Sequence, residues 1–94
     1  MNDRQKLIKL IEDYLHKQIT VKNFTDHYTL FFHLEMDDDG SMAGEEKEQF
    51  RELADIADRY SPYEGELIKY KSVYFSEEDV YRTAKKVYET LVDF

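Results

Sequence analysis

The spacing of apolar residues is the feature that most restricts how this chain folds. In four stretches, near residues 3–17, 20–36, 44–60 and from 76 onward, apolar side chains recur at intervals of three and four. This interval places them on one side of an α-helix, so each stretch is predicted to be an amphipathic helix. The side chains predicted to be buried are Leu7, Ile8, Leu10, Ile11, Tyr14 and Leu15; Phe24, Tyr28, Phe31, Phe32 and Leu34; Phe50, Leu53, Ala54, Ile56 and Ala57; and Val80, Tyr81, Ala84, Val87, Tyr88 and Leu91. The predicted fold class is all-α.

Local signals set the ends of these helices. Thr20 offers a side-chain oxygen as an N-cap, and Ser76 with Asp79 forms a variant of the capping box. Pro62 stops the third helix because proline disfavours helix in the residue before it. The join between the first two helices is short, which favours an antiparallel arrangement. The prediction is therefore a four-helix antiparallel bundle with one long loop, 61–75, between the third and fourth helices.

The long loop is rich in tyrosine. Tyr60, Tyr63, Tyr70 and Tyr74 lie in it or beside it, and tyrosine is enriched at protein interfaces. We expect Tyr60 and Tyr74 to be half-buried anchors, and 73–75 to be a short extended piece against the bundle. A connection of this length indicates either a short extra turn or a functional loop.

The size and charge of the chain limit its function. Its 94 residues are enough for one domain, 1–94, with a single modest core. The formal charge of -8 repels nucleic acid and anionic membranes and attracts a basic protein. There is no cysteine, and we find no signal peptide and no apolar run long enough to cross a membrane. We expect a soluble, cytoplasmic protein, monomeric or weakly dimeric.

The negative charge is concentrated in one quarter of the chain. Residues 35–58 contain 10 acids and 2 bases, whereas the other 70 residues contain 11 acids and 11 bases. A charge run of this kind is either a solvated helix face or a surface that steers a basic protein into contact. The second interpretation predicts a secondary acidic patch, formed by Asp37, Asp38, Asp39, Glu45 and Glu46.

The segment EMDDDGSMAGEE has the spacing of a calcium loop. Glu35, Asp37, Asp39 and Glu46 fall on ligand positions 1, 3, 5 and 12, with Gly40 at position 6. Position 1 is glutamate instead of aspartate, and the chain has no second loop of this kind. A single EF-hand-like calcium site therefore stays open as an alternative, while the main prediction is that the chain binds no metal.

No motif indicates catalysis. His16, His27 and His33 do not have the spacing of a metal site, and the chain has no G-x-S-x-G turn and no cysteine nucleophile. The acids are numerous, but no sequence signal places them in a cleft that separates their pKa values. We expect a protein that is not an enzyme and uses no cofactor or small-molecule substrate.

Three segments together resemble a known family. They are LIEDYLHKQITVKNFTDHYTLFF, FRELADIADRYSPYEGE and SEEDVYRTAKKVYETL. Their order, the Ile19-Thr20 junction before Phe24, and the ADRYSP helix end resemble the colicin D immunity proteins over nearly the whole chain. The resemblance implies a small, acidic, cysteine-free helical inhibitor of a toxin that cuts tRNA in the anticodon loop. It also implies that the acidic inhibitor occupies the toxin site meant for RNA phosphates.

The resemblance and the charge argument agree on the partner, which is a basic nuclease toxin domain. Carboxylates on rigid helices can replace phosphate oxygens in bidentate contacts with arginine. The resemblance is clearest from Asp58 onward, so the predicted partner-binding residues are Asp55, Asp58, Tyr63, Glu64 and Glu66. The chain is thus predicted to be an immunity protein; a generic acidic adaptor for another basic protein remains the further alternative.

Overall fold

The elements that the structure describes are all helical. A computed structural model describes residues 2–36, 40, 42–69 and 74–92, without the side chains of Glu64, Glu66 and Leu67. Its helices are α1 (Asp3–Leu15), α2 (Val21–Leu30), η1 (Phe31–Glu35), α3 (Gly44–Asp58), α4 (Glu64–Lys69) and α5 (Glu77–Val92). The described residues contain no strand, and Tyr60 and Phe75 form an isolated parallel β-bridge. The all-α prediction is confirmed.

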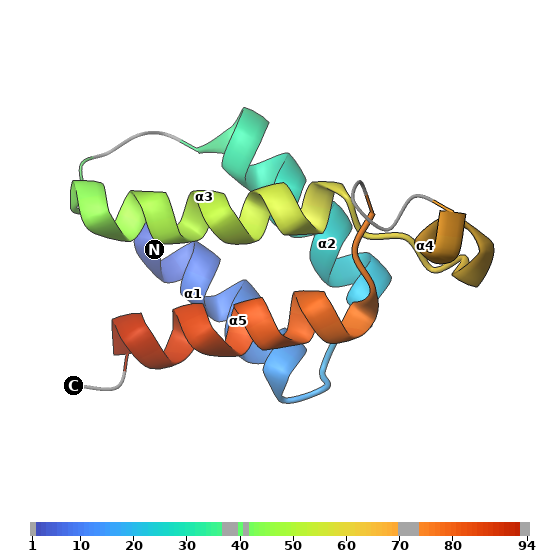
Figure 1. Cartoon of the computed structure of the whole chain (residues 1–94). Coiled ribbons are helices and arrows are strands. Elements are labelled where there is room, and N and C mark those ends of the chain that lie inside the picture. Colours follow the sequence, from blue (N-terminus) through green and yellow to red (C-terminus); the bar gives the residue numbers. More distant parts are fainter. Residues whose placement is uncertain (1, 37–39, 41, 70–73, 93–94) are drawn as a thin grey trace.

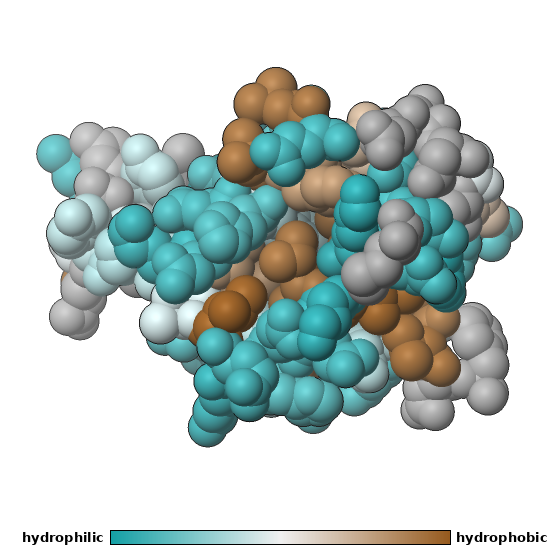
Figure 2. Space-filling model, turned by 180° about the vertical axis from the view of Figure 1, so that it is seen from behind, coloured by the Kyte–Doolittle hydropathy of each residue, from teal (hydrophilic) through white to brown (hydrophobic). Residues whose placement is uncertain are grey.

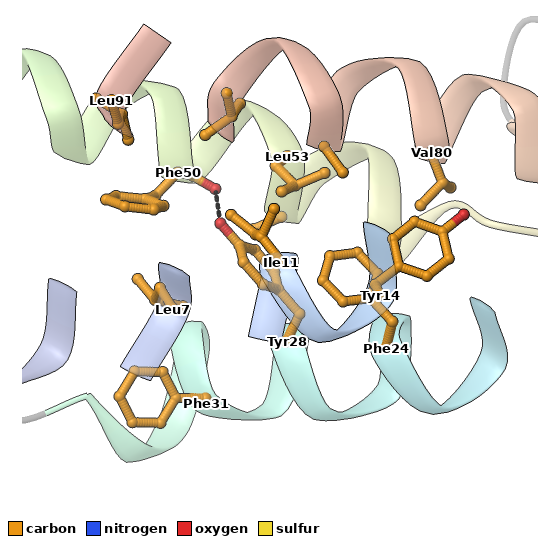
Figure 3. Packing of buried hydrophobic residues seen from close by; sticks show 13 residues of the cluster. Leu7, Ile11, Tyr14, Phe24, Tyr28, Phe31, Phe50, Leu53, Val80 and Leu91 are labelled. Carbon is orange, nitrogen blue, oxygen red and sulfur yellow. Dashed lines mark hydrogen bonds between the residues drawn. The ribbon is translucent and has the colours of Figure 1, made fainter. Parts of the chain in front are cut away.

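Four of these helices form the bundle. In sequence order α1, α2, α3 and α5 each pack against the next, and α5 closes the ring against α1. Figure 1 shows α3 and α5 side by side in front of α1 and α2. The labelled side chains show that the chain direction alternates: Leu7 to Tyr14 runs one way, and Phe24 to Phe31 runs back (Figure 3). The predicted four-helix antiparallel bundle is thus observed.

The core lies between the two helix pairs and is built around aromatic side chains. The rings of Tyr14 and Phe24 stack with centroids 4.5 Å apart. The fully buried hydroxyl of Tyr28 donates a hydrogen bond of 2.9 Å to the carbonyl oxygen of Phe50, which joins α2 to α3 (Figure 3). The buried hydrophobic cluster comprises Leu7, Ile11, Tyr14, Phe24, Tyr28, Phe31, Phe50, Leu53, Ala54, Val80, Ala84, Val87 and Leu91.

Capping explains why several helices begin where they do. The Thr20 hydroxyl accepts from the N–H of Asn23 at 3.2 Å, as the sequence predicted. Ser76 and Asp79 bond reciprocally: the Asp79 carboxylate accepts from the Ser76 N–H at 3.1 Å, and Ser76 Oγ accepts from the Asp79 N–H at 3.4 Å. The predicted capping box therefore starts α5.

Two helices end earlier than the periodicity predicted. α1 ends at Leu15 because Lys17 adopts a left-handed conformation with φ of 59°, and Gln18 N–H then bonds back to Asp13 at 2.8 Å. α3 ends at Asp58 because the next residues pair with another segment. The N–H of Phe75 donates to the Arg59 carbonyl at 2.8 Å, and the Ser61 N–H donates to the Phe75 carbonyl at 3.0 Å.

Three details differ from the predicted pattern. The second helix continues past Leu30 as the π-helix η1, so its last turn is wider than an α-turn. Leu34, predicted to be buried, is 78% exposed, and Tyr81 is 42% exposed although its ring still meets that of Tyr14 edge to face. The predicted loop 61–75 contains the short helix α4, which stands apart at one end of the bundle (Figure 1).

The anchoring of the long connection was predicted in part. Tyr60 and Tyr74 are both half-buried, as expected. Phe75 of the predicted extended piece forms the bridge to Tyr60, but Tyr70 and Val73 lie outside the described residues. The bridge holds the segment after α4 against the end of α3.

Candidate protein-binding surface

A row of carboxylates lies on the outward side of α3. Glu45, Glu48, Glu52 and Asp55 follow one another at intervals of three and four, so one side of the helix carries them all, and all four are exposed. The buried residues of α3 lie on its opposite side. The order of residues within α3 is therefore enough to place its acidic side chains and its buried side chains on opposite sides of the helix. We call these four residues the acidic row.

Few cations neutralise the acidic row. Arg51 lies 3.3 Å from Glu48, and Lys86 of α5 lies 3.6 Å from Glu52, with all four side chains at least half exposed. The first and last carboxylates of the row pair with no cation in the described residues. Exposed pairs of this kind contribute little to stability, about 1 kcal/mol or less. The surplus charge of α3 is thus directed toward solvent. A shallow depression at the row is lined by Glu48, Gln49, Arg51, Glu52 and Asp55.

Glu46, predicted as part of the secondary acidic patch, instead faces the bundle. One of its oxygens accepts from the N–H of Ala43 at 3.1 Å, and the other accepts from Arg4 Nε of α1 at 2.9 Å. The hydrogen bond from Ala43, followed by the contact with Arg4, lowers the pKa of the Glu46 carboxyl. Spacing alone did not reveal that Arg4 lies across from Glu46, and the proposed role of Glu46 in the secondary acidic patch stays a prediction.

Asp58, a predicted contact residue, lies at the end of α3 beside η1. Its Oδ2 is 2.8 Å from His33 Nε2, and both side chains are about two-fifths exposed. The ring of His33 meets Phe32 edge to face at 5.4 Å between centroids. A partner cation that reaches Asp58 must compete with His33.

An apolar edge that the sequence did not predict adjoins Asp58. Leu30 is 45% exposed and Leu34 is 78% exposed. Figure 2 shows hydrophobic side chains protruding at the top of the molecule, where Figure 1 places η1. The only sequence signal was that Leu30 fell outside the predicted core stripe. We call the depression lined by Asp26, Thr29, Leu30, His33, Leu34 and Asp58 the α2–α3 edge.

The remaining predicted contacts lie on or near α4. Tyr63 is 66% exposed, and its N–H donates to the hydroxyl oxygen of Ser61 at 3.2 Å. Glu64 and Glu66 lie within α4, at its first and third residues, but their side chains are outside the described residues. The structure thus places Asp55 and Asp58 on one helix and the other three predicted residues beyond it.

The possible calcium loop is described only in part. Glu35 is exposed at the end of η1, and Gly40 has a φ of 77°, a conformation that favours glycine. Asp37, Asp38 and Asp39 lie outside the described residues. The two oxygens of Glu46, which an EF-hand would use for bidentate binding, are both engaged by Ala43 and Arg4. Among the described residues there is no group of three or more His, Asp or Glu side chains that could hold a metal.

A third depression lies on the other side of the bundle. It is lined by Leu15, Tyr81, Lys85, Tyr88, Glu89 and Val92 of α1 and α5. Nearby, the buried hydroxyl of Tyr14 has no hydrogen-bond partner among the residues that the structure describes, and burial raises the Tyr14 pKa to about 12. The side chains lining this depression have mixed charge, in contrast to the acidic row.

Comparison with known proteins does not identify the chain. None of the helices that the structure describes is both long and apolar enough to cross a membrane. No protein family, curated protein or solved structure matches the sequence or the fold. The resemblance to colicin D immunity proteins therefore remains a prediction from the quoted segments.

Proposed function

We propose that this chain is an immunity protein, or antitoxin, that binds a basic nuclease toxin domain in the cytoplasm and masks its RNA-binding cleft. The observation that carries the proposal is the acidic row, a set of exposed carboxylates along one rigid helix with few neutralising cations. The function needs no catalysis and no cofactor, because occupying the cleft is sufficient to exclude RNA.

The chemistry of a nuclease cleft fits such a row. A protein that binds RNA neutralises several phosphates with Arg and Lys side chains, so its empty cleft is strongly positive. Carboxylates spaced along a helix present oxygens to these cations without the cost of ordering a flexible loop. Their potential also accelerates encounter, so the row is expected to act mainly on the association rate.

The test is to co-express the chain with the nuclease domain encoded beside its gene and to measure complex formation and RNA cleavage. The decisive variant neutralises the row: E45Q/E48Q/E52Q/D55N. Its matched control neutralises four acids on α1 and α5, D13N/E77Q/E78Q/E89Q, and so has the same net charge. The row variant should lower the association rate at least 10-fold at low salt, whereas the control should lower it no more than 3-fold.

Failure to bind the nuclease domain would overturn the proposal, and so would either of two further results. If the chain binds the nuclease but leaves RNA cleavage unchanged, it is an acidic adaptor and does not mask the cleft. If the row variant and its control weaken binding equally, net charge alone explains attraction and α3 is not the contact surface. Circular dichroism of both variants checks that each remains helical.

A further inference from the structure

From the geometry of the α2–α3 edge, we infer that it receives an arginine side chain of the basic partner, with the aliphatic stem on Leu34 and the guanidinium at Asp26 and Asp58. The inference rests on the proposed function and specifies a contact that the acidic row does not supply. It predicts that the contact at this edge controls the dissociation rate of the complex with the partner.

The apolar part of the site consists of two leucines that the described residues leave exposed. Leu30 and Leu34 are four residues apart and lie on one side of the continuous α2 and η1 segment, away from the buried Phe24, Tyr28 and Phe31. Leu34 is the most exposed of the large hydrophobic side chains described. It lies in a π-helical turn, a conformation that often occurs at functional sites.

The charged part of the site consists of two carboxylates from different helices. Asp26 of α2 and Asp58 of α3 both line the α2–α3 edge and also the neighbouring depression toward Pro62. Lys22 lies 3.3 Å from Asp26, and these side chains are 78% and 62% exposed. Asp58 contacts His33 at 2.8 Å, also near the surface. Because both contacts are exposed, an incoming cation can replace them at little cost.

Arginine fits this combination better than lysine. Its planar guanidinium donates several hydrogen bonds in a fixed fork, so it can bond to two carboxylates at once, whereas an ammonium is a compact and strongly hydrated charge. The methylene stem of arginine covers apolar surface while its head remains at the carboxylates. Leucines beside paired acids therefore match both ends of one side chain.

A second copy of this chain is a poor occupant. Each copy has a formal charge of -8, and the exposed leucines are bordered by carboxylates, so two such edges would repel each other. A basic partner meets no such barrier. Asp58 also follows Asp55 by one turn of α3, which makes the edge continuous with the acidic row.

The first experiment uses capped tripeptides as probes and needs no nuclease. Ac-Gly-Arg-Gly-NH2, its lysine analogue and its neutral citrulline analogue are titrated into the 15N-labelled protein. We expect saturable amide shifts near His33, Leu34 and Asp58 with the arginine peptide, at least 3-fold weaker binding with lysine, and none with citrulline. Shifts of equal size along the acidic row, or equal binding of arginine and lysine, would overturn the inference in favour of general charge attraction.

Variants separate the apolar from the charged contribution. Leu34→Ser and Asp58→Asn should each weaken the arginine peptide at least 3-fold. Val92→Ser is the control for the leucine because Val92 is 42% exposed at the far end of α5. Asp26→Asn should weaken the arginine peptide to a similar degree, and Asp13→Asn is its control, because Lys9 and Asp13 repeat the spacing of Lys22 and Asp26. If the site variants and their controls weaken binding of the arginine peptide equally, the arginine side chain does not bind at the α2–α3 edge.

The nuclease complex then distinguishes this inference from the proposed function. With the nuclease domain, Leu34→Ser should raise the dissociation rate about 10-fold and leave the association rate nearly unchanged, the opposite of the row variant. If the nuclease is bound and inhibited but Leu34→Ser has no effect, the inference is wrong and the function stands. If the arginine peptide binds as expected but the nuclease is not bound, the function is wrong and the arginine site stands.

Discussion

The inward and outward sides of α3 have opposite character, since one is apolar and buried and the other is acidic and exposed. Phe50, Leu53, Ala54 and Ala57 are buried on one side, and the acidic row occupies the other. The inward side determines where the helix lies, whereas the outward side makes only two exposed ion pairs with described residues. The comparison indicates that the acidic row, unlike Glu46, contributes little to the stability of the fold.

The largest effect on stability is expected when two residues close in sequence, but on opposite sides of α3, are each replaced by alanine. Phe50→Ala should lower the free energy of unfolding by about 3–5 kcal/mol, because it leaves a cavity among fully buried rings. Glu52→Ala, half a turn away, should change the free energy by less than about 0.5 kcal/mol. Urea unfolding followed by circular dichroism measures both. A loss above about 1 kcal/mol for Glu52→Ala would show that the row contributes to the fold.

A sharper test compares two adjacent glutamates. Glu46→Gln should cost about 1 kcal/mol at pH 7, because it weakens the contacts with Ala43 and Arg4. Glu45→Gln should cost less than about 0.5 kcal/mol, because Glu45 is exposed. Thermal or urea unfolding of the two variants beside the wild type gives both differences.

The pH dependence of these variants has a definite sign. The pKa of Glu46 is lowered in the folded state, so its contribution is fully present above the unfolded pKa of about 4.3 and is lost as pH falls through the lower folded value. The difference between wild type and Glu46→Gln should therefore shrink below about pH 4. A difference that persists at pH 2 would assign it to packing instead of charge.

The smallest expected effect is that of calcium. Because both Glu46 oxygens are engaged within the chain, millimolar calcium should shift the midpoint of thermal unfolding by less than about 1 °C. Calorimetric titration with and without a chelator checks the same point. Tight stoichiometric binding that is lost in Glu46→Ala would establish the EF-hand alternative and would place Glu46 on the outward side.

The sequence predicted the bundle because burial repeats with the period of a helix. The positions of Phe24, Tyr28, Phe50 and Val80 in the core followed from spacing alone. Spacing could not predict that Glu45 is exposed while Glu46 is paired within the bundle. The pairing depends on Arg4, which is 42 residues from Glu46. Periodicity equally cannot reveal where a helix runs beyond its neighbours, and this is why Leu34 was placed in the core.

The candidate surface was predicted less completely than the fold. Two of the predicted contact residues, Asp55 and Asp58, are exposed, and Asp58 lines the α2–α3 edge. Leu30 and Asp26 were missed because a single exposed leucine or a paired aspartate carries no signal in one sequence. Only the packing of α2 against α3 brings them beside Asp58.

The Arg4 side chain has a consequence for local opening of the bundle. It contacts Glu46 near the start of α3 and donates a hydrogen bond of 3.0 Å to the Leu91 carbonyl oxygen near the end of α5. Helix ends normally fray and exchange their amide hydrogens quickly. Here one guanidinium from the first turn of α1 joins the ends of three helices, so their terminal turns should exchange together. Replacing Arg4 should release all three at once while exchange around Tyr28 stays slow.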